Sequence, residues 1–322
     1  MTYDLKRLAK FAGFQEIVPP FGYRWWYFDA FSDDYRYGIT IIAFIGSVFS
    51  PYYAFSRDRG RGNPYNHCAI NVSLYGKGGK RWSMTERSHQ SVTQSSQSFS
   101  VGPSSLELSE KNLTINISEW TFPIPGRLNG KVEITPKTLI GDPVTLDDQG
   151  PHFWQPIAPI CEVDVNFDTP HRQWKGRGYF DTNWGSQPLE SGFKSWDWSR
   201  ADLPNGRSAI LYDVVRKNNE RFSLARVIDK EGNIDAFNAP VSRTLKKSLW
   251  RVERHTQSDP AYRPKVISTL EDAPFYARSM IKTSILGSPV TAMHESLNLD
   301  RFASKWVQAL LPFKMPRQIR KA

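Results

Sequence analysis

The chain has 322 residues, of which 39% are hydrophobic and 13% aromatic, and its formal net charge is +10. A chain of this length can bury one large hydrophobic core or two of medium size. The positive charge suits nucleic acid or an anionic membrane surface, but the Lys and Arg residues are scattered and no nucleic-acid-binding motif is present, so we expect no nucleic-acid partner.

The first part of the chain predicts neither a secretion signal nor a membrane span. Residues 1–14 are basic and amphipathic but lack the apolar region and cleavage site of a signal peptide. The longest apolar run, residues 39–55, is interrupted by Ser50 and Pro51 and falls short of the ~20 residues that a spanning helix needs. It predicts a buried strand followed by a loop that lines a pocket.

Several short segments alternate apolar and polar residues, which is typical of half-buried strands. Three sets share a face within their segment: Ile70, Val72 and Leu74; Leu113, Ile115 and Ile117; Val163, Val165 and Phe167. Turn signals at residues 76–79, 204–206 and 229–232 separate such runs. The pattern predicts a mainly antiparallel β protein.

A weak internal repeat divides the chain. Trp26-Tyr27-Phe28 leads into an apolar strand at residues 37–42, and Trp196-Asp197-Trp198 leads into another at residues 207–212. Each half starts with paired aromatics, crosses a polar turn and then enters the strand. The repeat predicts two similar β domains that join between residues 168 and 194.

Two motifs place an ionisable residue two positions from a large aromatic residue: His152 with Trp154, and Asp181 with Tyr179. In extended backbone, residues two apart share a face. The intervening residues, Phe153 and Phe180, then point to the opposite face. The motifs indicate a carboxyl group surrounded by aromatic rings. Such an acid is expected to stay protonated and to be able to protonate an apolar substrate.

The C-terminal stretch is the strongest helix candidate. Phe302, Trp306 and Leu310 are spaced four apart, and Pro312 ends the pattern. Basic residues follow: Lys314, Arg317, Arg320 and Lys321. The pattern suits a helix packed across the mouth of a β domain, or an interfacial helix whose basic tail meets an anionic membrane surface.

The chain resembles the acyclic carotenoid 1,2-hydratases, also called hydroxyneurosporene synthases. The resemblance rests on the segments around His152 and Asp181 and on further segments that follow in order along nearly the whole chain. These are residues 23–30, 41–53, 67–72, 84–87, 269–278, 294–297 and 310–317. Each segment alone is weak evidence for the family, and the resemblance depends on the number of segments and on their order.

The resemblance implies a fold and an activity. The fold is mainly β, with two tandem lipocalin-like antiparallel β-barrel or sandwich domains, which we expect at residues 1–172 and 173–322, and a C-terminal helix with a basic tail. The activity is that of a hydro-lyase, which adds water across the terminal 1,2 double bond of an acyclic carotenoid of the lycopene or neurosporene type. The catalytic roles fall on Asp181, His152, Tyr179 and Trp154.

Alkene hydration needs a strong proton donor and water, and no electron transfer. The sequence has no glycine-rich nucleotide loop, nucleophile elbow or zinc signature, so we expect no cofactor and no metal. In our hypothesis Asp181 protonates C2, a cation forms at the tertiary C1, and water adds there. Burial raises a carboxyl pKa by up to ~3–5 units, which keeps the acid protonated. His152 either positions the water and accepts its proton or restores the proton on Asp181.

Aromatic rings are expected to stabilise the cation and to line the substrate path. Trp154, Tyr179 and Trp184 are assigned to the cation, for which a desolvated ring face is worth ~2 kcal/mol or more. Trp184 is included only for its position close to Asp181 in the sequence. The other aromatic residues expected to bind substrate are Trp26, Phe28, Tyr52, Tyr53, Trp196 and Trp198.

Two observations favour a plainer interpretation of these motifs. Lys175 and Arg177 alternate onto the same face as Asp181, and a nearby cation lowers the pKa of a carboxyl group. Asp181 also begins a turn-like sequence, in which Asp often bonds backbone amides. Asp29 repeats the spacing of Asp181 after a Tyr, so by symmetry it is either a second site residue or a relic of the repeat, and we favour a structural role.

Other functions remain open. A carrier of a long apolar ligand needs the aromatic pocket but no buried acid, and a related β-barrel pericyclase needs neither His152 nor Asp181. A carbohydrate-active β-sandwich also uses Trp and acidic residues, but the apolar run at residues 39–55 argues against it. Because an acyclic carotenoid dissolves in lipid, we expect a cytoplasmic protein that binds peripherally to the membrane. Cys68 and Cys161 are expected to be free thiols.

Overall fold

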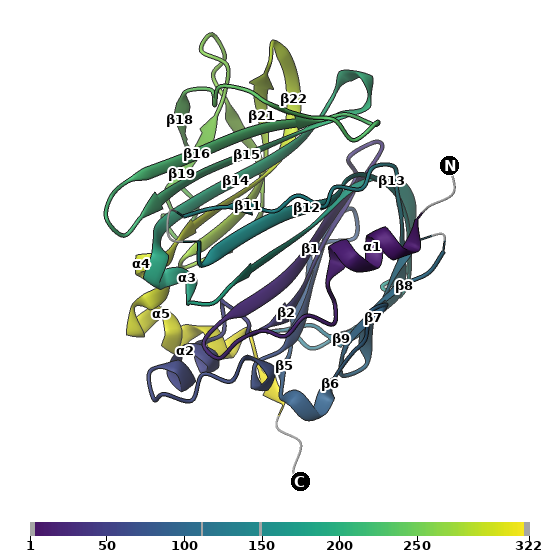
Figure 1. The fold of residues 1–322 in the computed structure, drawn as a ribbon, viewed down its shortest axis with the longest axis vertical. Helices are drawn as coiled ribbons and strands as arrows, with labels where there is room; N and C mark the ends of the chain where they lie inside the picture. The colour runs from purple at the N-terminus through teal and green to yellow at the C-terminus, as the bar shows by residue number, and fades with distance from the viewer. Residues whose placement is uncertain (1–3, 111, 148–149, 319–322) are drawn as a thin grey trace. The chain divides into compact units, whose positions relative to one another are not determined.

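The computed structural model describes residues 4–110, 112–147 and 150–318 (Figure 1). The fold is mainly β, as the sequence predicts. The chain separates into two compact units: unit 1 comprises residues 1–188 with 309–322, and unit 2 comprises residues 189–308. The division into domains at residue 172 stays a prediction.

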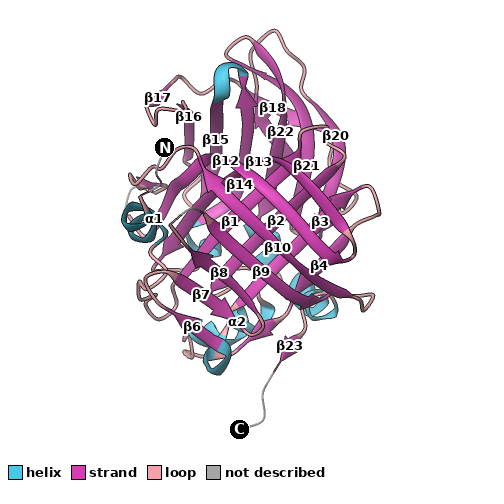
Figure 2. Cartoon of the chain, turned by 90° about the vertical axis from the view of Figure 1, so that its right-hand side faces the viewer, coloured by secondary structure: helices cyan, strands magenta, loops and turns pink. Residues whose placement is uncertain are grey.

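Unit 1 contains a 12-stranded antiparallel sheet with the order β4-β3-β2-β1-β13-β12-β10-β9-β8-β7-β6, and β11 pairs with β12. Its strands are β1 (Tyr23–Ser32), β2 (Tyr37–Ile45), β3 (Ala69–Gly76), β4 (Arg81–Met84), β6 (Val92–Gln94), β7 (Ser98–Val101), β8 (Ser104–Leu108), β9 (Leu113–Trp120), β10 (Arg127–Pro136), β11 (Val144–Thr145), β12 (His152–Thr169) and β13 (Arg172–Gly185). Figure 2 shows β1, β2 and β3 side by side in this sheet.

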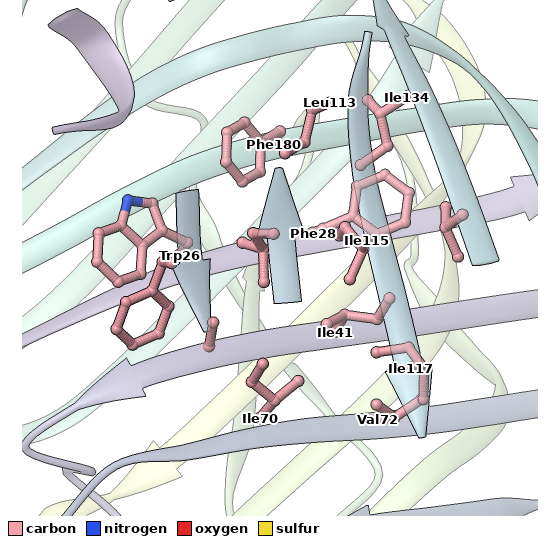
Figure 3. Close-up of a cluster of buried hydrophobic side chains, with 14 of the residues drawn as sticks. Trp26, Phe28, Ile41, Ile70, Val72, Leu113, Ile115, Ile117, Ile134 and Phe180 are labelled. Carbon is pink, nitrogen blue, oxygen red and sulfur yellow. The ribbon is translucent and has the colours of Figure 1, made fainter. Parts of the chain in front are cut away.

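The sheet of unit 1 curls, so that strands far apart in its order face one another. Ile115 and Ile117 of β9 lie near Ile41 of β2 and Val72 of β3 (Figure 3). Beyond these strands, the Phe122 amide donates a hydrogen bond to the Trp82 carbonyl oxygen at 3.1 Å. The curled inner face therefore encloses one apolar core.

The three alternating sets predicted from the sequence all point into this core, so each set shares a buried face as expected. The core also contains helix α1 (Leu5–Ala12), which buries Leu8 and Ala12. Asp4 caps this helix by accepting from the amides of Lys6 and Arg7, and Gly13 ends it in the left-handed region with φ 58°. Cys68 and Cys161 are buried free thiols.

The prediction for residues 39–55 is correct for the strand and wrong for the loop. β2 ends at Ile45, and the following segment forms helix α2 (Pro51–Arg57). Ser50 accepts from the Tyr53 amide as the N-cap, and Pro51 occupies the first turn, where its missing N–H costs nothing. Two sequence features that favour a helix start were therefore present but not used.

Unit 2 contains a seven-stranded antiparallel sheet with the order β17-β16-β15-β14-β22-β21-β20 and a separate β18–β19 pair. Its elements are α3 (Leu189–Gly192), β14 (Phe193–Leu203), β15 (Arg207–Arg216), β16 (Arg221–Ile228), β17 (Ile234–Ala236), β18 (Ser242–Leu245), β19 (Arg254–Gln257), β20 (Lys265–Ala273), β21 (Tyr276–Ile285), β22 (Ser288–Asn298) and α4 (Leu299–Ala303). In unit 1 the first strand, β1, pairs with β2 and β13, and in unit 2 the first strand, β14, pairs with β15 and β22. The two similar tandem domains that the weak repeat predicts stay a prediction.

The C-terminal helix is present but divided. α4 ends at Ala303, Ser304 has extended backbone, and α5 (Lys305–Leu310) follows. The break separates the predicted apolar stripe, because Phe302 is buried whereas Trp306 and Leu310 are exposed.

Part of the basic tail is bound to unit 1. β23 (Arg317–Gln318) pairs in parallel with β5 (Glu86–Arg87), and Arg317 forms an ion pair with Glu86. Lys314 Nζ lies 4.3 Å from the centre of the Trp82 ring. Arg320 and Lys321 lie outside the described residues. Among the residues that are described, no helix has the length and apolar character to cross a bilayer.

Candidate active site

The two faces of β1 and β13 carry different chemistry, although both are buried. Phe28 and Phe180 are register partners on the core face. On the opposite face, Tyr27 pairs with Asp181, and Asp29 pairs with Tyr179. Side chains of cross-strand partners lie on the same side of a sheet, so these four form a rectangle with the two Asp residues on one diagonal.

Asp181 accepts two hydrogen bonds on the same carboxylate oxygen. The Tyr179 hydroxyl donates to Oδ2 at 2.6 Å, and Trp154 Nε1 donates to Oδ2 at 2.8 Å. Trp154 Nε1 also lies 3.2 Å from the Tyr179 hydroxyl oxygen. The side chain of Asp181 is not in bulk solvent, since the residue is 2% exposed. Three of the four residues expected to be catalytic are therefore in direct contact.

The surroundings of Asp181 act in two directions. Burial opposes ionisation of the carboxyl group, whereas the two hydrogen-bond donors favour it. Of the two cations that the sequence places on this face, Lys175 is exposed and pairs with Asp164 at 3.2 Å, and Arg177 is exposed. Both donors bind Oδ2, so a proton on the neutral acid sits on Oδ1.

The side chain of His152 lies on the same face of the sheet as Asp181 but at a different position along the strands. Its register partner is Gly185, four residues from Asp181, which corresponds to about 13 Å along β13 at about 3.3 Å per residue. Its Nδ1 is 2.9 Å from the Tyr23 hydroxyl oxygen, and its Nε2 is 3.8 Å from Asp147 Oδ2. Burial lowers the pKa of His152 to about 4, so the imidazole is neutral at pH 7.

Three of the predicted aromatic residues lie on the other face of the sheet from Asp181. Trp26 and Phe28 belong to the apolar core, where Trp26 Nε1 donates to the Ala12 carbonyl oxygen at 2.7 Å. Trp184 is three residues from Asp181 and therefore points away from it; it stacks on Phe153 at 5.4 Å between ring centres. We do not include these three residues in the site proposed below.

The remaining predicted aromatics occur in other surroundings. Tyr53 is buried on α2, and its hydroxyl donates to the Gly22 carbonyl oxygen at 2.7 Å. Tyr52, on the same helix, has the Arg317 guanidinium 5.9 Å from its ring centre. Trp196 and Trp198 are buried in unit 2, where Trp196 packs on Tyr212 with ring centres 5.3 Å apart.

The structure brings together residues that sequence reasoning did not connect, including Asp29, to which it assigned a structural role. Tyr27 and Asp29 of β1 complete the rectangle with Asp181 and Tyr179. Alternation along β1 places both on the face opposite to Phe28, but only the pairing of β1 with β13 reveals their neighbours. Thr40 of β2 is the register partner of Asp29, and no described residue makes a hydrogen bond to its buried hydroxyl.

Unit 2 holds a separate buried polar cluster that the sequence did not indicate. Asp197 accepts a hydrogen bond from the Ser296 hydroxyl and one from the His255 amide. His294 Nε2 lies 3.1 Å from the Ser296 hydroxyl. Burial raises the pKa of Asp197 to about 8, and burial, assisted by Arg254 and His255, lowers the pKa of His294 to about 3.

We expect Asp197→Asn to flatten the pH dependence of stability. The folded state keeps the proton of Asp197 up to about pH 8, whereas the unfolded chain releases it near pH 4, so folding takes up a proton between these values. For each pH unit of increase between these values, the free energy of unfolding of the wild type falls by about 1.4 kcal/mol, and that of the Asn variant does not. Urea midpoints between pH 5 and 8 measure the effect. The exposed Asp235→Asn is the control, and an unchanged slope in the Asp197→Asn protein contradicts the assignment.

These features define a mainly β protein of lipocalin-like fold with a buried carboxyl group held by aromatic donors. Among solved structures, one described as a putative AttH from Nitrosomonas europaea is similar in fold, with a TM-score of 0.60 and 14% identity over 86% of this chain and 92% of that one.

Sequence comparison gives the family. The model described as "Carotenoid hydratase CrtC" matches residues 41–322. A protein named acyclic carotenoid 1,2-hydratase from Thiocapsa roseopersicina is 48% identical over 93% of this chain and 74% of its own length. A relative of the same name from Rubrivivax gelatinosus is 43% identical over 95% of this chain and 76% of its own length. The chain belongs to the carotenoid hydratase family.

Proposed function

We propose that the protein adds water across the terminal 1,2 double bond of an acyclic carotenoid and gives a 1-hydroxy product. The observation that carries the proposal is the buried Asp181 carboxyl group, which Tyr179 and Trp154 hold by one oxygen. Membership of the carotenoid hydratase family and the printed names of the relatives support the substrate class. A carrier of the same ligand has no use for a buried acid that is positioned in this way.

The first step is proton transfer from Asp181. The O–H bond at Oδ1 breaks, the π electron pair forms a C–H bond at C2, and the tertiary carbon C1 becomes a cation. A positioned general acid typically contributes 10²–10⁴-fold to a rate. The rings of Trp154, Tyr179 and Tyr27 stand next to the acid and stabilise the cation through their π faces.

Asp29 supplies the second carboxyl group of the reaction. It is 0% exposed and lies diagonally across from Asp181, an arrangement that brings the two Cβ atoms somewhat closer than about 7–8 Å. We propose that the double bond and a water lie between the two carboxyl groups, beside the Tyr27 and Tyr179 rings, whose centres are 6.3 Å apart. Asp29 and the Thr40 hydroxyl hold the water, which adds to C1 and transfers its proton to the Asp29 carboxylate.

The proton then returns to Asp181 and the cycle closes. The Tyr179 hydroxyl donates to Asp181, and Tyr179 is the register partner of Asp29, so we propose that the proton passes between the two carboxyl groups by way of this residue. The net change is one water added to one double bond, and no electrons are exchanged with a cofactor. We assign His152 a positioning role, because its neutral imidazole is hydrogen-bonded to the Tyr23 hydroxyl about 13 Å along the strand from Asp181.

Incubation with lycopene in water labelled with heavy oxygen tests the function. With no cofactor added, we expect a hydroxylated product that carries one labelled oxygen for each hydrated end, detected by mass analysis. A parallel reaction in ordinary water under labelled O₂ is the control and should give no label. The absence of a hydrated product, or a label that comes from O₂, contradicts the proposal.

A lipid-dissolved substrate also requires access to a bilayer. We propose that the protein acts as a peripheral protein on the membrane surface. The described tail supports this role less than the sequence suggests, because Arg317 is paired with Glu86 and Lys314 lies against Trp82.

A further inference from the structure

We infer that unit 2 carries the surface that docks on an anionic lipid bilayer. The surface consists of three side chains, Leu249, Trp250 and Trp306, which we call the docking patch. The inference rests on the proposed function for its purpose, because a protein that takes a carotenoid from lipid must reach the bilayer. Its test does not depend on catalysis.

The docking patch gathers large apolar side chains in solvent. Leu249 is 89% exposed, Trp306 is 49% exposed and Trp250 is 42% exposed. Arg301 connects the two Trp residues, because its Nη1 donates to the Trp250 carbonyl oxygen at 2.9 Å and its guanidinium lies 5.7 Å from the centre of the Trp306 ring. Single exposed apolar residues are normal in a soluble protein, whereas clusters of them indicate an interaction surface.

Hydrogen bonds of backbone amides hold the loop that contains Leu249 in place. The amides of Leu249 and Trp250 donate to the Asp272 carboxylate at 2.6 and 3.4 Å. The Ser248 hydroxyl accepts from the Val252 amide at 3.1 Å, and Arg251 adopts the left-handed region with φ 60°. These hydrogen bonds fix a tight turn with Leu249 at its tip, so the exposed position of Leu249 is a property of the folded loop.

The charge around the docking patch selects an anionic bilayer as its occupant. Lys246, Lys247 and Arg251 are exposed on the same loop, and Lys305 precedes Trp306. Lys247 pairs with Glu253, which leaves Lys246 and Arg251 to supply most of the positive charge of the loop. Trp side chains favour the headgroup region, an apolar tip inserts among acyl chains, and basic residues bind anionic lipid.

Vesicle sedimentation without carotenoid tests the inference. We expect the wild type to bind vesicles of phosphatidylcholine with phosphatidylglycerol several-fold more tightly than phosphatidylcholine alone. The double variant Leu249→Ser/Trp250→Ser should lose about tenfold or more of this binding, because it removes the inserting groups and keeps the backbone bonds to Asp272. The matched control is Ile124→Ser, which changes an exposed apolar residue of unit 1 (81% exposed) and should bind as the wild type does.

A charge variant gives a second, independent measurement. Lys246→Gln/Arg251→Gln should lower binding to anionic vesicles by about fivefold per charge and leave the weak binding to neutral vesicles unchanged. Wild-type binding by the patch double variant, an equal loss in the control, or no binding by the wild type would each overturn the inference. The first and last outcomes would also exclude a lipid role for this surface and leave a protein partner as its occupant.

Activity separates this inference from the proposed function. The docking-patch variants should hydrate lycopene in detergent micelles at the wild-type rate and lycopene in anionic vesicles more slowly. A wild type that binds vesicles through the patch but hydrates nothing would contradict the proposed function alone.

Discussion

Asp181→Asn is expected to lower carotenoid hydration by about 10²–10⁴-fold, the contribution of a positioned general acid. Asn keeps the shape of the side chain and can accept from Tyr179 and Trp154 through its carbonyl oxygen, but it has no acidic proton to give. The measurement is the initial rate of hydrated product from lycopene, together with thermal unfolding to establish that the variant is folded.

The exposed Asp168→Asn in the same unit serves as the matched control and should have the wild-type rate. A folded Asp181→Asn protein that hydrates lycopene at close to the wild-type rate would remove Asp181 as the acid, and the proposed mechanism with it.

Asp29→Asn is expected to separate the two halves of the reaction. In deuterated water Asp181 still delivers deuterium to C2, but without the Asp29 carboxylate the water is not deprotonated and the cation is not captured. In the cation the C1–C2 bond is single, so the CHD group turns and brings its original hydrogen to the Asp181 carboxylate, which removes it and restores the double bond. We expect hydrated product to fall by about 10²-fold or more while recovered lycopene gains deuterium at C2, measured by mass analysis and NMR.

The comparison with Asp181→Asn makes this result specific. Asp181→Asn should lose both hydration and deuterium exchange, because no acid remains to protonate C2. If Asp29 is only structural, its variant should lose the two activities in proportion, and that outcome would refute its role as the base.

Much of the site was predictable from the sequence, because it depends on spacing within a strand. Alternation brings Tyr179 beside Asp181, and the structure places the two 2.6 Å apart. Trp154 was grouped with them through the family resemblance, and it donates to the same oxygen. The error with Trp184 came from judging nearness by chain position, since an odd step along a strand moves a side chain to the opposite face.

The rest depends on which strands pair, and a single sequence does not give this. Tyr27 and Asp29 are about 150 residues from Asp181 in the chain and become its neighbours only through the register of β1 with β13. The register of β12 with β13 places His152 opposite Gly185, which is also the partner of Tyr23 in β1, and so away from the position of Asp181 along the strand. Helix α2 differs, because Ser50 followed by Pro51 is a local signal for a helix start that could have been recognised.

The two donors on Oδ2 of Asp181 have a stereochemical consequence. A carboxyl group anchored by Tyr179 and Trp154 presents Oδ1 from one fixed side. In the proposed mechanism, an alkene that binds in one orientation therefore receives its new hydrogen on one prochiral face of C2. The reaction leaves the gem-dimethyl carbon achiral, but in deuterated water the neighbouring carbon becomes a CHD group, which we expect to form with a single configuration.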